Sequence, residues 1–406
     1  MSNYSNINIC IAGKNNIAVE ILMYLLDKGI IRKNICVIPN KTDNGKDGWQ
    51  RSLLKKAKEL GVEVKNLDEI YHIDNLLFLS LEFDRIIDPS KFKSEKLFNI
   101  HFSLLPKYKG MYTSCMPILN NERITGVTFH KIDKGIDTGG IIAQEEFEID
   151  FMDNARDLYH KYIHYGTLLV KKCLEKLLKN EFIEIKNQNI KDSSYYSKSC
   201  IDFKNINIDL NQTAINIHNQ IRAFNFREYQ LPKVFGVEII SSKILNTKSD
   251  KKPGNILFEN DLCYAISTVD YDIVLYKDRA KDLYYACENG LTDLVNRLLQ
   301  IPKIVNVQDE DGKTPLMIAI HNNQKEIVKT LLINGVDLSI CDFKGSTPLM
   351  YAANAFVNHN DPDILKLLLN FDLNIYQKDY ANKNVLDYCV ENNNIEALNI
   401  IKGNKL

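Results

Sequence analysis

The chain is organised around residues 97–141, LFNIHFSLLPKYKGMYTSCMPILNNERITGVTFHKIDKGIDTGGI. The apolar run at residues 97–102 predicts a buried strand. Because side chains alternate along a strand, Asn99 and His101 are expected on the same face of it. A second apolar run, residues 126–132, leads into a glycine-rich loop that carries Asp137. The sequence therefore predicts an amide, an imidazole and a carboxylate in one site.

This combination of side chains is what acyl transfer to an amine requires. The amide stabilises the developing oxyanion, and the imidazole accepts the amine proton. The carboxylate fixes the imidazole tautomer and favours its charged form. The pattern predicts Asn99, His101 and Asp137 as catalytic residues. The alternative is that Asn99 and His101 only satisfy buried backbone groups.

The two halves of this stretch closely resemble the signature of the folate-dependent formyltransferases, Asn-x-His-x-Ser-x-Leu-Pro followed by Asp-x-Gly-x-Asp-Thr-Gly. In this chain the signature begins at Asn99 and ends at Pro106, and its second half runs from Asp133 to Gly139. Two halves in the right order are more specific than one short motif. The resemblance implies 10-formyltetrahydrofolate as the formyl donor, without a metal. It also implies folate-binding residues, which we expect to be Ser80, Glu82, Phe83, Asp84, Arg85, Ile86, Asp133 and Gly135.

The formyl acceptor is predicted from two further segments. Residues 108–114, YKGMYTS, are most similar to the branch of the family that acts on nucleotide-linked amino sugars. Residues 222–229 mix arginines with aromatic side chains, which suit a pyrophosphate and a base, although a surface turn with aromatic core residues is the alternative. Trp49 fits the acceptor pocket and the core equally well. The predicted substrate-binding residues are Lys14, Trp49, Met111, Tyr112, Thr113, Ser114, Arg222, Asn225, Phe226, Arg227 and Tyr229.

The charge balance argues against a nucleic-acid acceptor. The formal net charge is -1, and no loop rich in lysine and arginine follows the first strands. The resemblance instead implies a dTDP-linked 3-amino-3,6-dideoxyhexose, with the gluco isomer expected first, made for O-antigen or another surface polysaccharide. A dTDP-4-amino-4,6-dideoxyglucose is the alternative acceptor.

The first part of the chain alternates between strands and helices. We expect strands at 6–13, 34–39, 62–65 and 76–81, and helices at 17–28, 49–60 and 153–178. This alternation predicts an open, mostly parallel α/β sheet that binds ligands at the carboxyl ends of its strands. By resemblance this is a Rossmann-like formyltransferase sheet within a catalytic domain at 1–183.

A polar stretch, residues 184–198, predicts a linker. The resemblance places a small β-rich domain after it, so that linker and β-rich domain together occupy 184–277. Residues 208–276 fit this expectation, with a helix at 213–223 and strands at 233–240, 255–257 and 273–276.

The remainder of the chain, 278–406, contains an internal repeat. Residues 313–319, KTPLMIA, recur as STPLMYA 33 residues later. This period and the TPLxxA motif predict an all-α ankyrin array, with terminal repeats at 283–299 and 384–401. Such an array predicts binding of a protein partner or a small ligand. A different hypothesis makes the array the functional part and the enzyme domain vestigial, but intact Asn99, His101 and Asp137 argue against it.

Histidine and cysteine patterns give no metal site. His160 and His164 have metal-pair spacing on a helix, but no further ligands follow, and we expect them to be structural. His130, on the strand before the Asp137 loop, could reach the site, but a structural, hydrogen-bonded histidine is expected. Nine scattered cysteines without CxxC spacing predict reduced thiols.

Without a basic leader or a long apolar run, a cytoplasmic bacterial protein is expected, and the family resemblance implies a homodimer.

Overall fold

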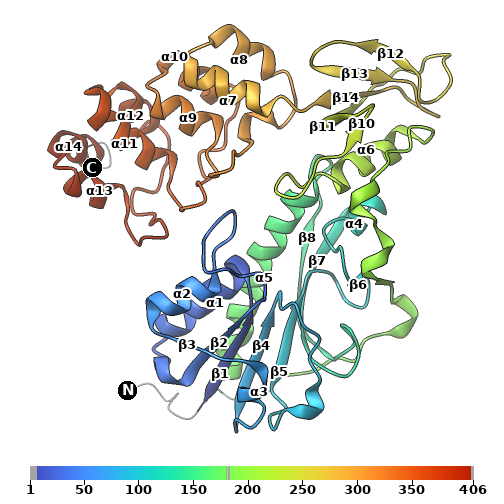
Figure 1. Cartoon of the computed structure of the whole chain (residues 1–406), viewed down its shortest axis with the longest axis vertical. Helices are drawn as coiled ribbons and strands as arrows, with labels where there is room; N and C mark the ends of the chain where they lie inside the picture. The colour runs from blue at the N-terminus through green and yellow to red at the C-terminus, as the bar shows by residue number, and fades with distance from the viewer. Residues whose placement is uncertain (1–6, 180, 182, 404–406) are drawn as a thin grey trace. The chain divides into compact units, whose positions relative to one another are not determined.

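The structure is a computed structural model that describes residues 7–179, 181 and 183–403 (Figure 1). The chain divides into two compact units. The first runs to Asp209 and includes Ile215–Pro232, and the second contains Leu210–Ala214 and the chain from Lys233 onward. The division into parts at 1–183, 184–277 and 278–406 stays a prediction.

The first unit contains a seven-stranded sheet of order β3-β2-β1-β4-β5-β7-β8. The first five of these strands pair in parallel, and β7 and β8 add antiparallel pairs. The predicted α/β class is therefore confirmed. The strands are β1 (Asn8–Gly13), β2 (Ile35–Pro39), β3 (Glu63–Val64), β4 (Leu76–Leu81), β5 (Leu97–His101), β7 (Ile124–Lys131) and β8 (Ile141–Glu148). The sequence pattern did not predict β8, because its middle residues 144–146 are polar and exposed at the edge of the sheet.

Both faces of the sheet are covered. Ile9 and Ile11 of β1 pack with α1 (Asn15–Asp27), α2 (Leu53–Leu60) and α5 (Ala155–Leu178) in one core. The alternate residues Cys10 and Ala12 belong to a smaller core on α3 (Leu67–Ile70). Both faces of β1 are therefore buried, as a parallel sheet requires. A short helix and a small two-stranded sheet complete the unit: α4 (Met116–Leu119), β6 (Lys109–Gly110) and β9 (Tyr195–Tyr196).

The helix expected at 49–60 begins later, at Leu53. The Ser52 hydroxyl caps it by accepting from the Lys55 N–H. The Asp43 and Asp47 carboxylates accept from the N–H groups of Leu54 and Ser52 and so order the preceding loop. This cap leaves Trp49 in a loop at the carboxyl end of β2.

The second unit begins with a five-stranded antiparallel sheet of order β10-β11-β14-β13-β12. The strand expected at 233–240 is divided by a turn in which Phe235 and Gly236 both have positive φ. The strand β13 was not predicted. The strands are β10 (Lys233–Val234), β11 (Val237–Ile244), β12 (Ile256–Glu259), β13 (Cys263–Ile266) and β14 (Ile273–Lys277). The helix α6 (Ala214–Ala223) precedes them in the chain and, from Ile215 on, belongs to the first unit.

The ankyrin array follows, as predicted. Each TPL motif starts a helix: Thr314 and Thr347 accept from backbone N–H groups three residues later, and proline occupies the first helical position. The helices are α7 (Ala280–Asn289), α8 (Thr292–Leu298), α9 (Pro315–His321), α10 (Lys325–Ile333), α11 (Pro348–His359), α12 (Asp363–Leu368), α13 (Val385–Glu391) and α14 (Ile395–Gly403). They share one core, to which the β-sheet contributes Ile240 and Leu262.

Replacing Thr314 by alanine is expected to destabilise the array by ~1 kcal/mol, because it removes a buried helix cap. Differential scanning calorimetry measures the effect as a lower melting temperature for the second unit. The matched control is Thr330→Ala in α10, where the hydroxyl bonds only to the carbonyl of Glu326 within the helix. Equal melting temperatures for the two variants would contradict the role of the cap.

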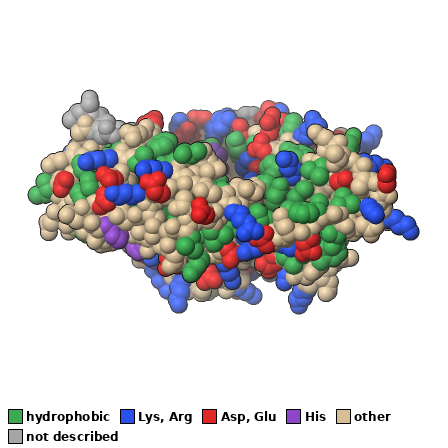
Figure 2. Space-filling model, turned by 90° about the horizontal axis from the view of Figure 1, so that it is seen from above, with side chains coloured by type: hydrophobic (Ala, Val, Ile, Leu, Met, Phe, Trp, Pro, Cys, Tyr) green, Lys and Arg blue, Asp and Glu red, His purple; other side chains and the backbone are tan. Residues whose placement is uncertain are grey.

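Acidic and basic side chains are mixed over the face seen in Figure 2, in keeping with the net charge of -1. None of the helices in the described part of the chain combines the length and the apolar composition that a bilayer crossing requires.

Candidate active site

The structure brings Asn99, His101 and Asp137 together at the end of β5. Asn99 Nδ2 lies 3.4 Å from Asp137 Oδ1, and His101 Nδ1 lies 3.4 Å from Asp137 Oδ2. The loop that carries Asp137 therefore folds back onto the strand, as the sequence predicted. His101 is buried, with 7% of its surface exposed.

A set of local bonds shapes the Asp137 loop. Asp133 Oδ1 accepts from the Gly135 N–H at 3.1 Å and from Thr138 Oγ1 at 2.6 Å. A side chain at Gly135 would place Cβ 2.0 Å from Thr138 Oγ1, so only glycine fits. Asp133 and Gly135, which we expected to contact folate, thus hold the loop in shape. At its tip Asp137 has a φ of +54°, and its Oδ2 accepts from the Gly110 N–H at 2.9 Å.

A backbone carbonyl fixes the tautomer of His101. The Nε2 atom lies 2.8 Å from the carbonyl oxygen of Tyr108, which accepts only, so the ring proton sits on Nε2. The lone pair of neutral His101 is therefore on Nδ1, beside Asp137. The carboxylate was expected to fix the tautomer as well as favour the charged ring. In the structure Tyr108 does the first, and Asp137 is placed to do the second.

The pKa values of the two groups follow from burial and pairing. Burial lowers the pKa of His101 below its usual 6.5, and Asp137 offsets only part of that shift. Burial alone would raise the pKa of Asp137, but the neighbouring His101 and the Gly110 N–H lower it, to about 2. Asp137 is therefore an ionised carboxylate near neutral pH.

His130 also lies in the site. It pairs with Asn99 across β5 and β7, and its Nε2 lies 3.0 Å from Asn99 Nδ2. Its Nδ1 donates to the Lys131 carbonyl at 2.7 Å, which leaves Nε2 to accept from Asn99. The sequence favoured a structural, hydrogen-bonded His130 but also allowed it to reach the site; its contact with Asn99 was not predicted. The strand register, which brings residues 99 and 130 opposite each other, was the missing information.

The residues expected to bind folate have diverse surroundings. Ser80 lies beside Asn99 in the adjacent strand. The Glu82 carboxylate accepts from Asn15 Nδ2 and Tyr159 Oη, at 3.1 and 2.8 Å, and burial raises its pKa. Asp84 accepts from the Lys41 N–H. Arg85 lies over the Phe83 ring at 4.6 Å, and Ile86 is 79% exposed. Glu82 and Asp84 thus have internal partners, whereas Ile86 is open to solvent.

Part of the expected acceptor site forms an aromatic cluster. The ring of Trp49 lies 5.4 Å from that of Phe226 and 5.7 Å from that of Tyr229, which is 63% exposed. Lys14 is near enough to Glu82 to interact with its charge. Trp49, Phe226 and Tyr229 therefore come together beside the carboxyl ends of β1, β2 and β4.

The arginine expected at a pyrophosphate has internal partners. Arg222 is buried and donates to the carbonyls of Asp150 and Asp153 and to Asn219 Oδ1. Its neighbour Asn225 is also buried, and Arg227 is half-buried. A substrate role for Arg222 thus rests on the resemblance alone.

The segment of residues 111–114 lies directly after β6. Met111 is 44% exposed, whereas Tyr112 donates to the Lys198 carbonyl and packs on Phe203. The carbonyl of Thr113 accepts from Tyr162 Oη, and Ser114 is half-buried before α4. Within the described residues, no group of three or more His, Cys, Asp or Glu side chains is arranged to hold a metal ion.

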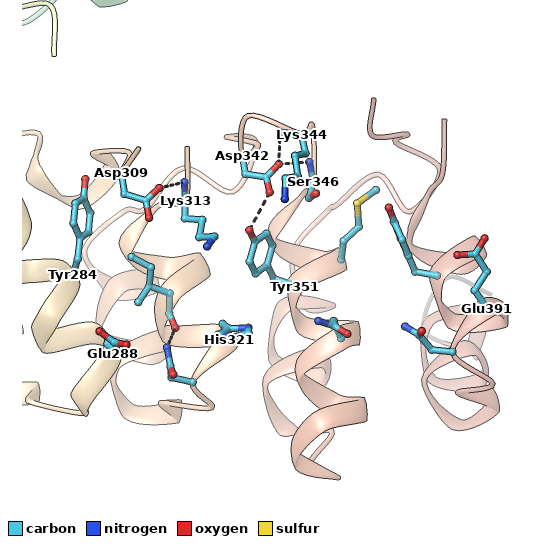
Figure 3. A pocket seen from close by; sticks show the side chains of 16 residues that line it. Tyr284, Glu288, Asp309, Lys313, His321, Asp342, Lys344, Ser346, Tyr351 and Glu391 are labelled. Carbon is cyan, nitrogen blue, oxygen red and sulfur yellow. Dashed lines mark hydrogen bonds between the residues drawn. The ribbon is translucent and has the colours of Figure 1, made fainter. Parts of the chain in front are cut away.

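A separate cavity of about 810 Å³ lies in the ankyrin array (Figure 3). Successive repeats contribute its walls, which combine tyrosines, carboxylates and lysines. Asp342 is fixed there by the N–H groups of Lys344 and Ser346 and by Tyr351 Oη. The charged and aromatic residues of the wall are Tyr284, Glu288, Asp309, Lys313, His321, Asp342, Lys344, Tyr351, Tyr388 and Glu391.

Comparisons with known proteins agree with this architecture. A family model described as formyl transferase matches residues 5–171, and one described as ankyrin repeats (3 copies) matches residues 283–375. The structure of WlaRD, a sugar 3N-formyl transferase solved with dTDP and 5-N-formyl-THF, is 47% identical. The match covers 67% of this chain and 98% of WlaRD, with a TM-score of 0.64.

Two other relatives extend the comparison. An N-formyltransferase from Helicobacter canadensis, solved with folinic acid and dTDP-3-aminofucose, is 48% identical. That match covers 67% of this chain and 100% of the other, with a TM-score of 0.63. The bifunctional polymyxin resistance protein ArnA of Wigglesworthia glossinidia brevipalpis is 34% identical over 240 residues, which is 55% of this chain and 36% of ArnA.

The chain is a formyltransferase that carries an ankyrin array. This class follows from the sheet, from the Asn-His-Asp site at the end of β5 and from the matching family models. Two relatives are aligned over nearly their whole length at 47% and 48% identity. The chain therefore belongs to the sugar N-formyltransferases of the formyl transferase family.

Proposed function

We propose that the enzyme transfers a formyl group from 10-formyltetrahydrofolate to the amine of a dTDP-linked 3-amino-3,6-dideoxyhexose. The observation that carries the proposal is the convergence of Asn99, His101 and Asp137 within 3.4 Å contacts. The donor and acceptor classes are supported by the relatives, which were solved with formylated folates and with dTDP or dTDP-3-aminofucose.

Each residue of the site has a definite task in this reaction. 10-Formyltetrahydrofolate would supply the formyl carbon, which is activated by its bond to N10; this bond breaks when the amine attacks, and the proton taken up by His101 would return to N10 of the leaving tetrahydrofolate. His101 accepts the amine proton at Nδ1, because Nε2 already carries the proton donated to Tyr108. Asp137 stabilises the resulting imidazolium. Asn99 donates to the formyl oxygen as it gains charge, using the hydrogen that faces Asp137 over a long 3.4 Å contact.

The folate is proposed to bind at the carboxyl ends of β4 and β5. Ser80 and Asn99 lie side by side at the ends of β4 and β5, and Phe83 and Ile86 follow directly on the β4 loop. Ile86 is 79% exposed, and an apolar side chain open to solvent suits contact with a flat heteroaromatic ring. The aromatic cluster of Trp49, Phe226 and Tyr229 is the corresponding surface for the nucleotide.

The pH dependence of the reaction follows from the buried His101. A general base works only when it is neutral, so kcat/KM falls as the pH drops through the pKa of His101. Because burial lowers that pKa, the acidic limb is expected below pH 6.5. A pH profile of kcat/KM, corrected for the fraction of acceptor amine that is neutral at each pH, measures its midpoint. An acidic limb centred above pH 6.5 would contradict the assignment of His101 as the base.

The finer identity of the acceptor is also a proposal. We favour the gluco isomer, made for O-antigen or another surface polysaccharide in a bacterial cytoplasm, by a homodimeric enzyme. The ankyrin array is proposed to bind a protein partner or a small ligand, and its 810 Å³ cavity is the place for the latter. Sedimentation velocity of the full chain tests the dimer, and a pull-down with the full chain as bait tests the partner.

Mass spectrometry of the sugar nucleotide tests the function directly. Purified enzyme is mixed with 10-formyltetrahydrofolate and either dTDP-3-amino-3,6-dideoxyglucose, its galacto isomer or the 4-amino-4,6-dideoxyglucose isomer. A formyl gain on a 3-amino sugar supports the proposal, and the ratio of kcat/KM values identifies the preferred isomer. Turnover of the 4-amino sugar alone would support formyl transfer but contradict the proposed 3-amino acceptor. No turnover of any of the three sugars would overturn the proposal.

A further inference from the structure

The segment predicted as a linker returns over the active-site loops. Lys186 pairs with Ile141, next to the end of the Asp137 loop, through backbone bonds of 2.7 and 2.8 Å. Further along the chain, β9 (Tyr195–Tyr196) pairs in parallel with β6 at Lys109 and Gly110. The Ser194 hydroxyl also accepts from the Tyr108 N–H at 2.8 Å. Residues 186–196 therefore contact both loops that hold the His101 and Asp137 pair.

Between these two attachments lies Gln188. Its Nε2 donates to the carbonyls of Asp137 and Gly139, both at 2.8 Å. Both hydrogens of the amide are thus used on the backbone of the loop. The Oε1 atom is buried and has no hydrogen-bond partner among the described residues. Turning the amide over would bring Oε1 against two carbonyl oxygens, so the donor arrangement is the one the site allows.

The Asp137 loop needs support of this kind. A non-glycine residue at a φ of +54° is in the sparsely populated left-handed region, so the local backbone does not favour the observed conformation. The Gly110 N–H holds the Asp137 side chain from one side. Gln188 is the group that holds the Asp137 carbonyl itself.

We propose that Gln188 is a positioning residue for formyl transfer, which acts by clamping the backbone of Asp137. The clamp keeps the Asp137 carboxylate beside Nδ1 of His101, where the imidazolium forms. Gln188 contacts neither reacting group through its own bonds, so its effect passes entirely through Asp137. This inference rests on the proposed function, because positioning matters only if Asp137 assists the transfer.

Kinetics of Gln188→Met test the clamp. Methionine keeps the length of the side chain and removes both donors. Because a small misplacement of a catalytic group costs much of its effect, kcat is expected to fall by about 10-fold or more with KM nearly unchanged. Gln188→Leu, which also lacks both donors and adds no charge, is expected to behave alike and serves if the methionine variant does not fold.

The matched control is Gln308→Met in the ankyrin array. The Gln308 Nε2 clamps two carbonyls in the same way, those of Gly312 and Cys341, at 2.7 and 2.9 Å. This variant loses the same kind of bonds in the other compact unit, and wild-type kcat is expected for it. Equal kcat values for the Gln188 and Gln308 variants would show that Gln188 has no special role in the reaction.

Two further readouts separate positioning from general stability. In an Asp137→Asn background, Gln188→Met is expected to change kcat by less than about twofold, because the group it positions has already been disabled. A histidine NMR titration, with His101 assigned by its loss in His101→Ala, is expected to show a lower His101 pKa in Gln188→Met. The titration does not require turnover, so it tests the clamp even if the proposed substrate is wrong. An unchanged His101 pKa and an unchanged kcat in a folded variant would overturn the inference.

Discussion

Replacing His101 by alanine is expected to lower kcat by about 10²- to 10⁴-fold, the usual contribution of a general base. In the wild type, the Tyr108 carbonyl holds the ring proton on Nε2 and leaves Nδ1 as the proton acceptor beside Asp137. Alanine removes that acceptor while β5 keeps its backbone pairing with β4 and β7. Single-turnover formation of the formylated sugar nucleotide, followed by mass spectrometry, measures the chemical step.

The control for this variant is His164→Ala. His164 lies on the exposed side of α5 and packs only on the edge of Tyr165 among the contacts described for it. It is expected to turn over at the wild-type rate. Thermal melting of both variants shows whether the His101 site still folds. A folded His101→Ala enzyme with more than a tenth of the wild-type rate would mean that the base is elsewhere.

Asp137→Asn is expected to give the second-largest loss, about 10²- to 10³-fold in kcat. Asparagine has the same shape and tolerates the positive φ of this position, so the loop is kept, while the negative charge and one of the two acceptor oxygens are lost. The loss in kcat is expected to be smaller than it would be if Asp137 also fixed the tautomer of His101, because the Tyr108 carbonyl fixes that tautomer. The imidazolium that forms on His101 loses its counter-charge, and its pKa falls further.

The sign of that pKa change gives a second test. Since the Asp137 carboxylate raises the pKa of His101 against the effect of burial, its removal moves the acidic limb of kcat/KM to lower pH. Asp27→Asn, at the exposed end of α1, removes one charge from the same unit as a control. An acidic limb that stays in place would show that Asp137 does not interact with the base.

Local sequence patterns identified the strand, the loop and the repeats. Alternation along residues 97–102 placed Asn99 and His101 on one face, and that placement is what brings both to Asp137. The TPL motifs predicted the capped helices at Thr314 and Thr347. These features depend on residues a few positions apart, where periodicity and capping preferences act directly.

Side-chain partners were less predictable, because a residue type does not say which neighbour it meets. Glu82 and Arg222 stay predicted ligand-binding residues, and the structure shows internal partners that the sequence did not predict. Tyr159 donates to Glu82, and the Asp150 and Asp153 carbonyls accept from Arg222. The edge strand β8 has too polar a centre to give a strand pattern. The burial that gives these groups internal partners exists only after the sheet, α5 and the loops have packed.

The sequence by itself determined the α/β sheet and the ankyrin array, because each is encoded by short-range patterns, and its formyltransferase-like signature predicted Asn99, His101 and Asp137 as the site residues. Only the tertiary structure decided how those residues work. The tautomer of His101 depends on the Tyr108 carbonyl. The orientation of Asn99 depends on the strand register that places His130 opposite it. The backbone of Asp137 is held by Gln188, which is 51 positions away in the sequence. Backbone carbonyls have no side-chain signature, and contacts between distant residues depend on the path of the folded chain.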